Sequence, residues 1–255
     1  MRRIRVIPTL LISNRKLVKT TRFQKPVYVG DPINTLKILN EKEVDEVCVL
    51  DIDASKKGLP PDMTYIRELA SECFMPFTYG GGITSVDQAK QILKLGVEKL
   101  VFGTTAITDP DLVSKVSRIA GAQSVVVSID VRKNWLGKYL INSNGGTKKH
   151  NISPAAFAQS AESMGVGEIL LQDIDREGTF GGYNLHLIRE VANQVGMPVI
   201  ISGGASAVED FLPAVNAGAS AVAAGALFMF KGSRKAVLIN YPSQEELFAK
   251  LYNAL

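Results

Sequence analysis

The chain has 255 residues, of which 46% are hydrophobic and 21% are charged. This composition excludes a disordered chain and is typical of a folded one that is long enough to bury a full core. The two cysteines exclude a disulfide framework and a metal site built from Cys-x-x-Cys pairs. We expect reduced thiols, no metal and no cofactor.

Two further features bear on location. Residues 211–230 carry no charge, but proline, asparagine and glycine interrupt them, so we expect a buried core segment rather than a membrane span. The basic N-terminus lacks the apolar stretch of an export signal. Together these features predict a cytoplasmic protein with no membrane span.

Positive charge is concentrated in two segments of a chain whose net charge is +4. Eight Lys and Arg residues precede the first acidic residue, Asp31, and residues 131–161 contain five more with no acidic residue. Such segments indicate an anionic partner. We expect a phosphorylated small molecule and no nucleic acid, because no helix-turn-helix, zinc-finger or RNP-like pattern accompanies the charge.

Short apolar runs alternate with amphipathic segments along the chain. The runs predict strands at 4–10, 47–51, 76–80, 99–102, 124–130, 168–172, 198–202 and 220–224. The segments between them predict helices, for which the candidate N-caps are Asp62, Thr84, Asp109, Ser153 and Ser206.

An internal repeat fixes the expected architecture. Residues 46–52 match 168–174, and the same offset of 122 places 75–83 on 197–205 without a gap. Eight βα units in two similar halves predict a single-domain (β/α)8 TIM barrel over residues 1–255, with half-barrels at about 1–122 and 123–245. A doubly wound open sheet is the alternative.

Glycine clusters follow the third and seventh predicted strands. Each has a second element one βα unit later, and bare N–H groups at such turns can bind a phosphate. Because the arrangement is duplicated, it predicts a ligand with a phosphate at each end; simple tight turns are the alternative. The candidate phosphate-binding residues are Gly82, Thr104, Gly203, Gly204 and Gly225, with Lys19 on the first loop.

Loops that follow the strands form the active face of such a barrel. Both basic segments begin there, at 11–30 and 131–150, and we expect them to overhang that face. Among the carboxylates that end strands, Asp130 is the best candidate for a general acid or base.

A charged set lies at the opposite ends of the strands. Arg5, Glu46, Lys99 and Glu168 stand at or just before four predicted strands, where they could close a ring of ion pairs across the barrel floor. From position alone, a purely stabilising salt-bridge network is the more frequent explanation.

Eight segments carry a resemblance to a known family: 17–19, 28–32, 50–55, 80–83, 125–130, 167–171, 175–179 and 202–205. Over nearly its whole length the chain resembles the cyclase subunit of imidazole glycerol phosphate synthase. The resemblance implies that a glutaminase subunit docks on the barrel floor and that ammonia crosses the barrel to a bisphosphorylated ribonucleotide.

The resemblance also implies roles for particular residues. It makes the four floor residues an ammonia gate rather than a stabilising network, and it makes the two glycine clusters phosphate sites. Glu98 and Gln123 resemble positions that contact the glutaminase.

The chain departs from the family at a catalytic position. The family uses one aspartate at the end of strand 1 and another at the end of strand 5. Asp130 matches the second, but Leu11 stands in place of the first, and Gly103 stands where an asparagine is usual. A leucine cannot transfer a proton, and loss of one general acid or base costs roughly 10²–10⁴ in rate.

These traits resemble a cyclase-like branch associated with sugar amidation in bacterial surface-polysaccharide (lipopolysaccharide) biosynthesis. In that branch the barrel supplies ammonia to a separate ATP-using amidotransferase. The first alternative is an ordinary cyclase subunit, which makes imidazole glycerol phosphate and AICAR from a formimino ribonucleotide and ammonia. The second is a non-catalytic scaffold that activates a glutaminase, and a phosphoribosyl isomerase is the weakest.

Overall fold

The computed structural model describes residues 4–232 and 234–255. Arg2 and Arg3, two of the eight basic residues before Asp31, lie outside these ranges. Eight parallel strands form the central sheet: β1 (Arg5–Ser13), β4 (Val47–Asp51), β5 (Phe77–Gly80), β6 (Lys99–Phe102), β7 (Val125–Lys133), β10 (Glu168–Asp173), β11 (Val199–Ser202) and β12 (Ala221–Ala224).

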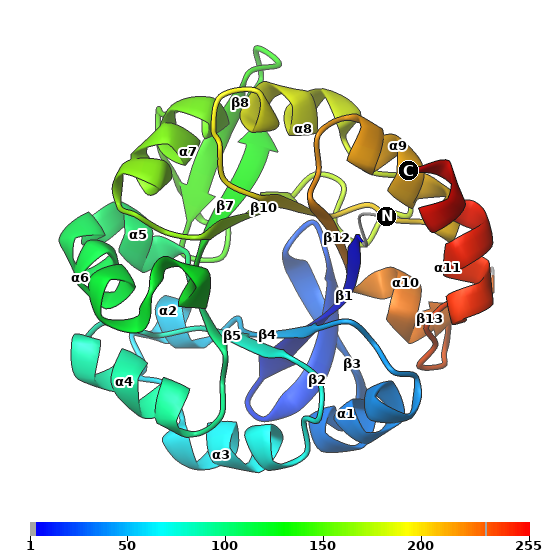
Figure 1. The fold of residues 1–255 in the computed structure, drawn as a ribbon. Coiled ribbons are helices and arrows are strands. Elements are labelled where there is room, and N and C mark those ends of the chain that lie inside the picture. The colour runs from blue at the N-terminus through cyan, green and yellow to red at the C-terminus, as the bar shows by residue number, and fades with distance from the viewer. Residues whose placement is uncertain (1–3, 233) are drawn as a thin grey trace.

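Each of these strands pairs in parallel with the next, and β12 pairs with β1, so the sheet closes into a barrel. Figure 1 looks along the barrel axis and shows the helices as an outer ring. The predicted (β/α)8 barrel is therefore confirmed, and the open doubly wound sheet is excluded.

Eleven α-helices lie in the described ranges. They are α1 (Pro32–Glu41), α2 (Ala54–Lys57), α3 (Met63–Ser71), α4 (Val86–Lys94), α5 (Thr104–Thr108), α6 (Pro110–Ala120), α7 (Pro154–Ser163), α8 (Leu185–Ala192), α9 (Phe211–Asn216), α10 (Ala226–Met229) and α11 (Gln244–Lys250). Short 3-10 turns occupy Ala122–Ser124, Val208–Asp210 and Tyr252–Ala254. No helix among the described residues has the length and apolar character needed to cross a bilayer.

Two apolar clusters fill the structure. The larger one lies between the strands and the helices, and on β1 it takes Val6, Leu10 and Ile12. The smaller one lies in the barrel lumen and takes Ile7 from the same strand, because successive side chains of a strand point to opposite faces. The other residues of this inner cluster are Cys48, Val101, Val126, Leu170, Ile200, Ala221 and Ala223.

The repeat is visible in the positions of the strands. β5 and β11 begin 122 residues apart, as do β6 and β12. Gly82 and Gly204, also separated by 122 residues, both adopt positive φ angles, of 70° and 107°. A division into half-barrels at 1–122 and 123–245 is consistent with these positions and stays a prediction.

The two basic segments contain strands rather than open loops. β2 (Lys16–Thr21) pairs antiparallel with β1 and with β3 (Gln24–Gly30), and β8 (Tyr139–Ser143) pairs antiparallel with β7 and with β9 (Lys148–Lys149). A separate small hairpin joins β13 (Phe230–Lys231) to β14 (Ala236–Val237). Both basic hairpins extend from the carboxyl ends of barrel strands, so they stand at the predicted active face.

Three of the five predicted N-caps are confirmed, since Asp62, Asp109 and Ser153 each accept a hydrogen bond from the backbone N–H three residues later. The prediction for Thr84 is wrong by one residue, because Ser85 caps α4. The prediction for Ser206 is also wrong, because its hydroxyl and N–H both donate to Asp210 instead of capping a helix.

Candidate functional site

A pocket opens at the carboxyl ends of the barrel strands. It encloses about 730 Å³ of empty space, including the part open to solvent. Strand ends and the turns after them supply most of its wall, and the two basic hairpins add Thr20, Phe23 and Gly145. The hydroxyl of Thr20 is buried and has no hydrogen-bond partner among the described residues.

Asp130 lies on β7 and lines this pocket. Burial raises the pKa of its carboxyl to about 6, against the opposing effects of a hydrogen bond from Ser128 and the charge of Lys56. The Ser128 hydroxyl lies 2.9 Å from the Asp130 Oδ1 atom. A carboxyl with a pKa near neutrality can both donate and accept a proton under ordinary conditions.

Leu11 lines the same pocket and is 6% exposed. Its side chain offers only apolar surface where a second acid or base would be needed. Another carboxylate, Asp51, also lines the pocket, but its Oδ1 atom accepts N–H bonds from Asp53 and Ala54 at 2.9 and 3.1 Å. Asp51 therefore caps the turn after β4, and burial raises the pKa of its carboxyl.

Sequence reasoning missed several polar residues of the pocket wall, among them Lys56 and Gln172. Gln172 stands next to the last residue of β10, so its place at a strand end was a usable signal. Lys56 belongs to α2 and lies so close to Gly145 that a side chain there would clash with it. No sequence pattern marks such a contact between a helix and a distant turn.

The first glycine cluster contributes Gly80 and Gly81 to the pocket, together with Gly103 and Thr104. The Thr104 hydroxyl accepts a hydrogen bond from the backbone N–H of Asn144 at 2.9 Å. Gly82 is not part of the wall: a Cβ atom there would lie 2.5 Å from the carbonyl oxygen of Leu59, so this glycine allows the loop to pack.

The second cluster forms a separate small pocket of about 200 Å³. Gly203, Gly204 and Gly225 line it, and the buried side chain of Glu177 lies at its edge. It occupies the position related to the first cluster by the 122-residue repeat, and phosphate binding at the two clusters stays a prediction.

Lys19 reaches this second cluster from β2. Its side chain is 3% exposed, and its Nζ atom donates a hydrogen bond to the carbonyl oxygen of Thr9 at 2.5 Å. The Nζ atom also lies where a side chain on Gly225 would stand. Burial lowers the pKa of Lys19 to about 8, although the charge of Glu177 opposes this shift.

Four charged side chains close a ring at the floor of the barrel. Arg5 bonds Glu46 at 2.5 Å and also bonds Glu168, while Lys99 bonds Glu46 and Glu168 at 3.0 and 2.9 Å. Glu46 accepts a further hydrogen bond from the Thr78 hydroxyl at 2.8 Å. Burial alone would lower the pKa of Arg5, but the two glutamates outweigh it and raise that pKa.

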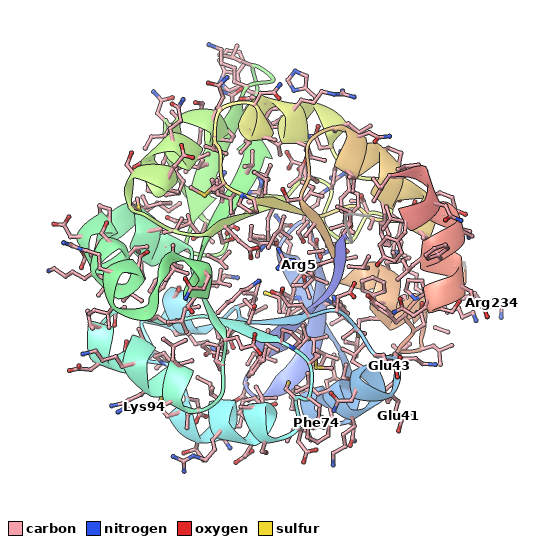
Figure 2. The ribbon with its side chains drawn as sticks, in the orientation of Figure 1. Arg5, Glu41, Glu43, Phe74, Lys94 and Arg234 are labelled. Atoms are coloured by element: carbon pink, nitrogen blue, oxygen red, sulfur yellow. The ribbon has the colours of Figure 1, made fainter. Side chains whose placement is uncertain are left out.

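Figure 2 shows Arg5 near the centre of this face. Glu98 and Gln123, the predicted contacts for a partner, are exposed beside the amino ends of β6 and β7 on the same face. The predicted floor residues therefore lie together.

A small apolar cavity separates the ring from the pocket. It encloses about 250 Å³, and Val101 lines both this cavity and the pocket above it. Glu46 and Thr78 form its lower end, and the rest is the inner apolar cluster. Charged species are strongly disfavoured in such a lumen, whereas a small neutral molecule is not.

The described residues contain no cluster of His, Cys, Asp and Glu side chains that could hold a metal ion. The chain is thus a (β/α)8 barrel that joins a charged floor ring to a glycine-lined pocket on its active face.

A family model described as histidine biosynthesis protein matches residues 5–234. The chain is 48% identical over 248 residues to a Pseudomonas aeruginosa protein provisionally named imidazole glycerol phosphate synthase subunit hisF2, covering 97% of this chain and 99% of the relative. A Leptospira interrogans protein, provisionally named subunit HisF, is 45% identical over 250 residues, covering 97% and 98%. Subunit HisF of Corynebacterium urealyticum is 38% identical over 229 residues, covering 89% and 90%. The chain belongs to the histidine biosynthesis protein family, among its HisF-like subunits.

Proposed function

We propose that this chain is the barrel subunit of a glutamine amidotransferase system. A separate glutaminase subunit docks on the floor, and its ammonia passes the ring of Arg5, Glu46, Lys99 and Glu168 into the apolar lumen. The observation that carries this proposal is the succession of ring, lumen cavity and active-face pocket: Glu46 belongs to both the ring and the cavity, and Val101 lines both the cavity and the pocket. A route of this kind keeps ammonia neutral and away from water.

The floor surface also fits a protein partner. Phe74 follows α3 on this side and is 84% exposed, with Glu41 and Glu43 at the end of the neighbouring α1 (Figure 2). Exposed aromatic side chains beside charged residues are typical of protein interfaces. HisF-like subunits imply such a glutaminase partner.

The finer proposal concerns the fate of the ammonia. Leu11 leaves Asp130 without a second acid at the position where the family has one, which supports a barrel that no longer cyclises a ribonucleotide. We propose that the ammonia serves a separate ATP-using amidotransferase that amidates a sugar for surface-polysaccharide biosynthesis. A cytoplasmic location is part of this proposal.

The alternative is a cyclase subunit of imidazole glycerol phosphate synthase. The names of the relatives favour it, and so do the two glycine-lined pockets that match a ligand with two phosphates. In that reaction Asp130 would act as general acid or base, and Asp51 would have to supply the second carboxylate.

An assay of the isolated chain with ammonium salt and the bisphosphorylated formimino ribonucleotide distinguishes the sugar-amidation role from the cyclase role. Ammonium replaces the glutaminase as the source of ammonia, and the loss of the ribonucleotide is measured. We expect the native chain to leave this substrate unconsumed, and Leu11→Asp to restore detectable turnover. Turnover by the native chain at the rate of authentic cyclase subunits would overturn the sugar-amidation proposal. A folded chain that binds a glutaminase but no phosphorylated ligand would instead favour the non-catalytic scaffold.

A further inference from the structure

We propose that Tyr241 is a positioning residue that holds Arg5 in the floor ring, with Asp45 and Tyr252 assisting it. This inference rests on the proposed function only for the use of the ring as an ammonia gate. Arg5 and Lys99 each bond both glutamates of the ring, and Arg5 is the more exposed of the two, with its side chain 28% exposed against 17%. Arg5 is therefore the ring member that most needs positioning.

The end of β1 that carries Arg5 has incomplete strand pairing. β1 pairs with β12 from Arg5 onward, but it pairs with β4 only from Thr9. Next to Arg5, both backbone groups of Val6 bond to side chains instead. The Val6 N–H donates to the Asp45 carboxylate at 3.0 Å, and the Val6 carbonyl oxygen accepts from the Tyr241 hydroxyl at 2.9 Å.

The residue on the other side of Arg5 is held in the same way. The carbonyl oxygen of Ile4 accepts a hydrogen bond from the Tyr252 hydroxyl at 3.2 Å. Both tyrosines are buried, and the ring of Tyr241 packs on Phe228 with centroids 5.4 Å apart. In Figure 1 the C-terminal end of the chain and the start of β1 lie on the same side of the ring, in agreement with these two hydrogen bonds.

The same short segment of chain supplies a ring carboxylate and an anchor for the strand. Glu46 bonds Arg5 directly, and its neighbour Asp45 bonds the backbone one residue beyond Arg5. A functional set of side chains must be held within about 0.5 Å of its working geometry by the groups around it. The backbone on both sides of Arg5 must therefore be fixed, and the C-terminal tyrosines do this.

The test uses Tyr241→Phe, which removes the hydroxyl and keeps the packed ring. Its matched control is Tyr183→Phe, because the Tyr183 hydroxyl is also buried and donates to a strand carbonyl, that of Ala223, at 2.9 Å. The readout is nitrogen NMR of the isolated full chain, which measures how fast the Arg5 guanidinium rotates about its Nε–Cζ bond. Hydrogen bonds from the guanidinium to both glutamates slow this rotation.

We expect Tyr241→Phe to speed the rotation at least tenfold, Tyr252→Phe to act in the same direction, and Tyr183→Phe to leave it within twofold. Equal effects in Tyr241→Phe and Tyr183→Phe would overturn the proposal, because they would show a general loss of stability. An unchanged rate in Tyr241→Phe would also overturn it.

The positioning role and the proposed function fail in different experiments. If Arg5 loosens in Tyr241→Phe but no glutaminase subunit binds the native chain, the positioning role stands and the ammonia route falls. If a glutaminase binds and Arg5 stays equally rigid in all variants, the ammonia route stands and the positioning role falls.

Discussion

Asp130 is the pocket residue whose pKa burial shifts most clearly. Its pKa rises from 3.8 to about 6 because burial disfavours the carboxylate. The folded chain therefore binds this proton more tightly than the unfolded chain does. The stabilising contribution is fully present below about pH 4 and is lost as the pH rises through about 6.

Asp130→Asn should therefore stabilise the protein at high pH only. We expect the free energy of unfolding to rise by about 3 kcal/mol at pH 8, since the pKa rises from 3.8 to about 6 and each pKa unit corresponds to about 1.4 kcal/mol. Near pH 4 the variant and the native chain should agree. Urea unfolding at both values measures the difference, and a gain of the same size at both would show that the carboxylate charge is not its cause.

Glycine at position 225 is required by Lys19 rather than by backbone conformation. A Cβ atom there would collide with the Lys19 Nζ atom, whereas a Cβ atom on Gly103, its counterpart in the repeat, would find Ser128 at 3.8 Å. We expect Gly225→Ala to lower the free energy of unfolding by about 1–3 kcal/mol, because the buried lysine must move.

Gly103→Ala is the matched control and should change the free energy of unfolding by less than about 0.5 kcal/mol. Thermal and urea unfolding of the two variants measure both values. Equal losses in the two would mean that the Lys19 contact does not set the requirement for glycine.

At the scale of elements, the sequence predicted all eight barrel strands to within a few residues. Parallel strands buried on both faces appear as continuous apolar runs, so β4 and β7 were recognisable without the structure. The strands of the two basic hairpins were not predicted from the sequence. Their alternation is obscured by lysine and exposed residues, as in β3, and they form because β1 and β7 offer unpaired edges beyond the barrel.

The hydrogen bonds that cap the start of a helix join residues close together in the sequence, and α4 offers a test of which residue is the cap. The Ser85 hydroxyl accepts from the Gln88 N–H at 3.2 Å, and the Gln88 side chain accepts from the Thr84 N–H at 2.8 Å. We expect Ser85→Ala to cost about 1 kcal/mol of stability, as loss of an N-cap usually does. Thr84→Ala should cost less than half as much in the same urea titration, and the reverse order would restore Thr84 as the cap.

At the scale of the whole molecule, the residues at the two ends of the barrel differ in how well they could be predicted from the sequence. The floor ring was predictable because its members sit at strand starts, which a closed barrel brings together. The pocket was predictable only in part. Asp130 was predictable from its place at a strand end and Leu11 from the family resemblance. Lys56 of α2 meets Gly145 of the turn between β8 and β9 through packing, which no spacing along the chain encodes.

The ring should also behave as one energetic unit. Glu46 is the most buried member, 3% exposed, and it accepts bonds from Arg5, Lys99 and Thr78. Glu46→Gln keeps the shape but leaves two cations facing the single carboxylate of Glu168. We expect this change to lower the free energy of unfolding by about 3 kcal/mol, because removal of one partner leaves a buried charge without its counter-charge.

Lys99→Met in the same chain removes the surplus cation, so the remaining Arg5 and Glu168 form a balanced pair. The double variant should then be more stable than the sum of the two single losses predicts, by at least about 1 kcal/mol. Urea unfolding of the native chain, Glu46→Gln, Lys99→Met and the double variant completes the cycle. Additive losses would mean that the four side chains act as separate surface pairs, and such a loose floor could not exclude water from the lumen above it.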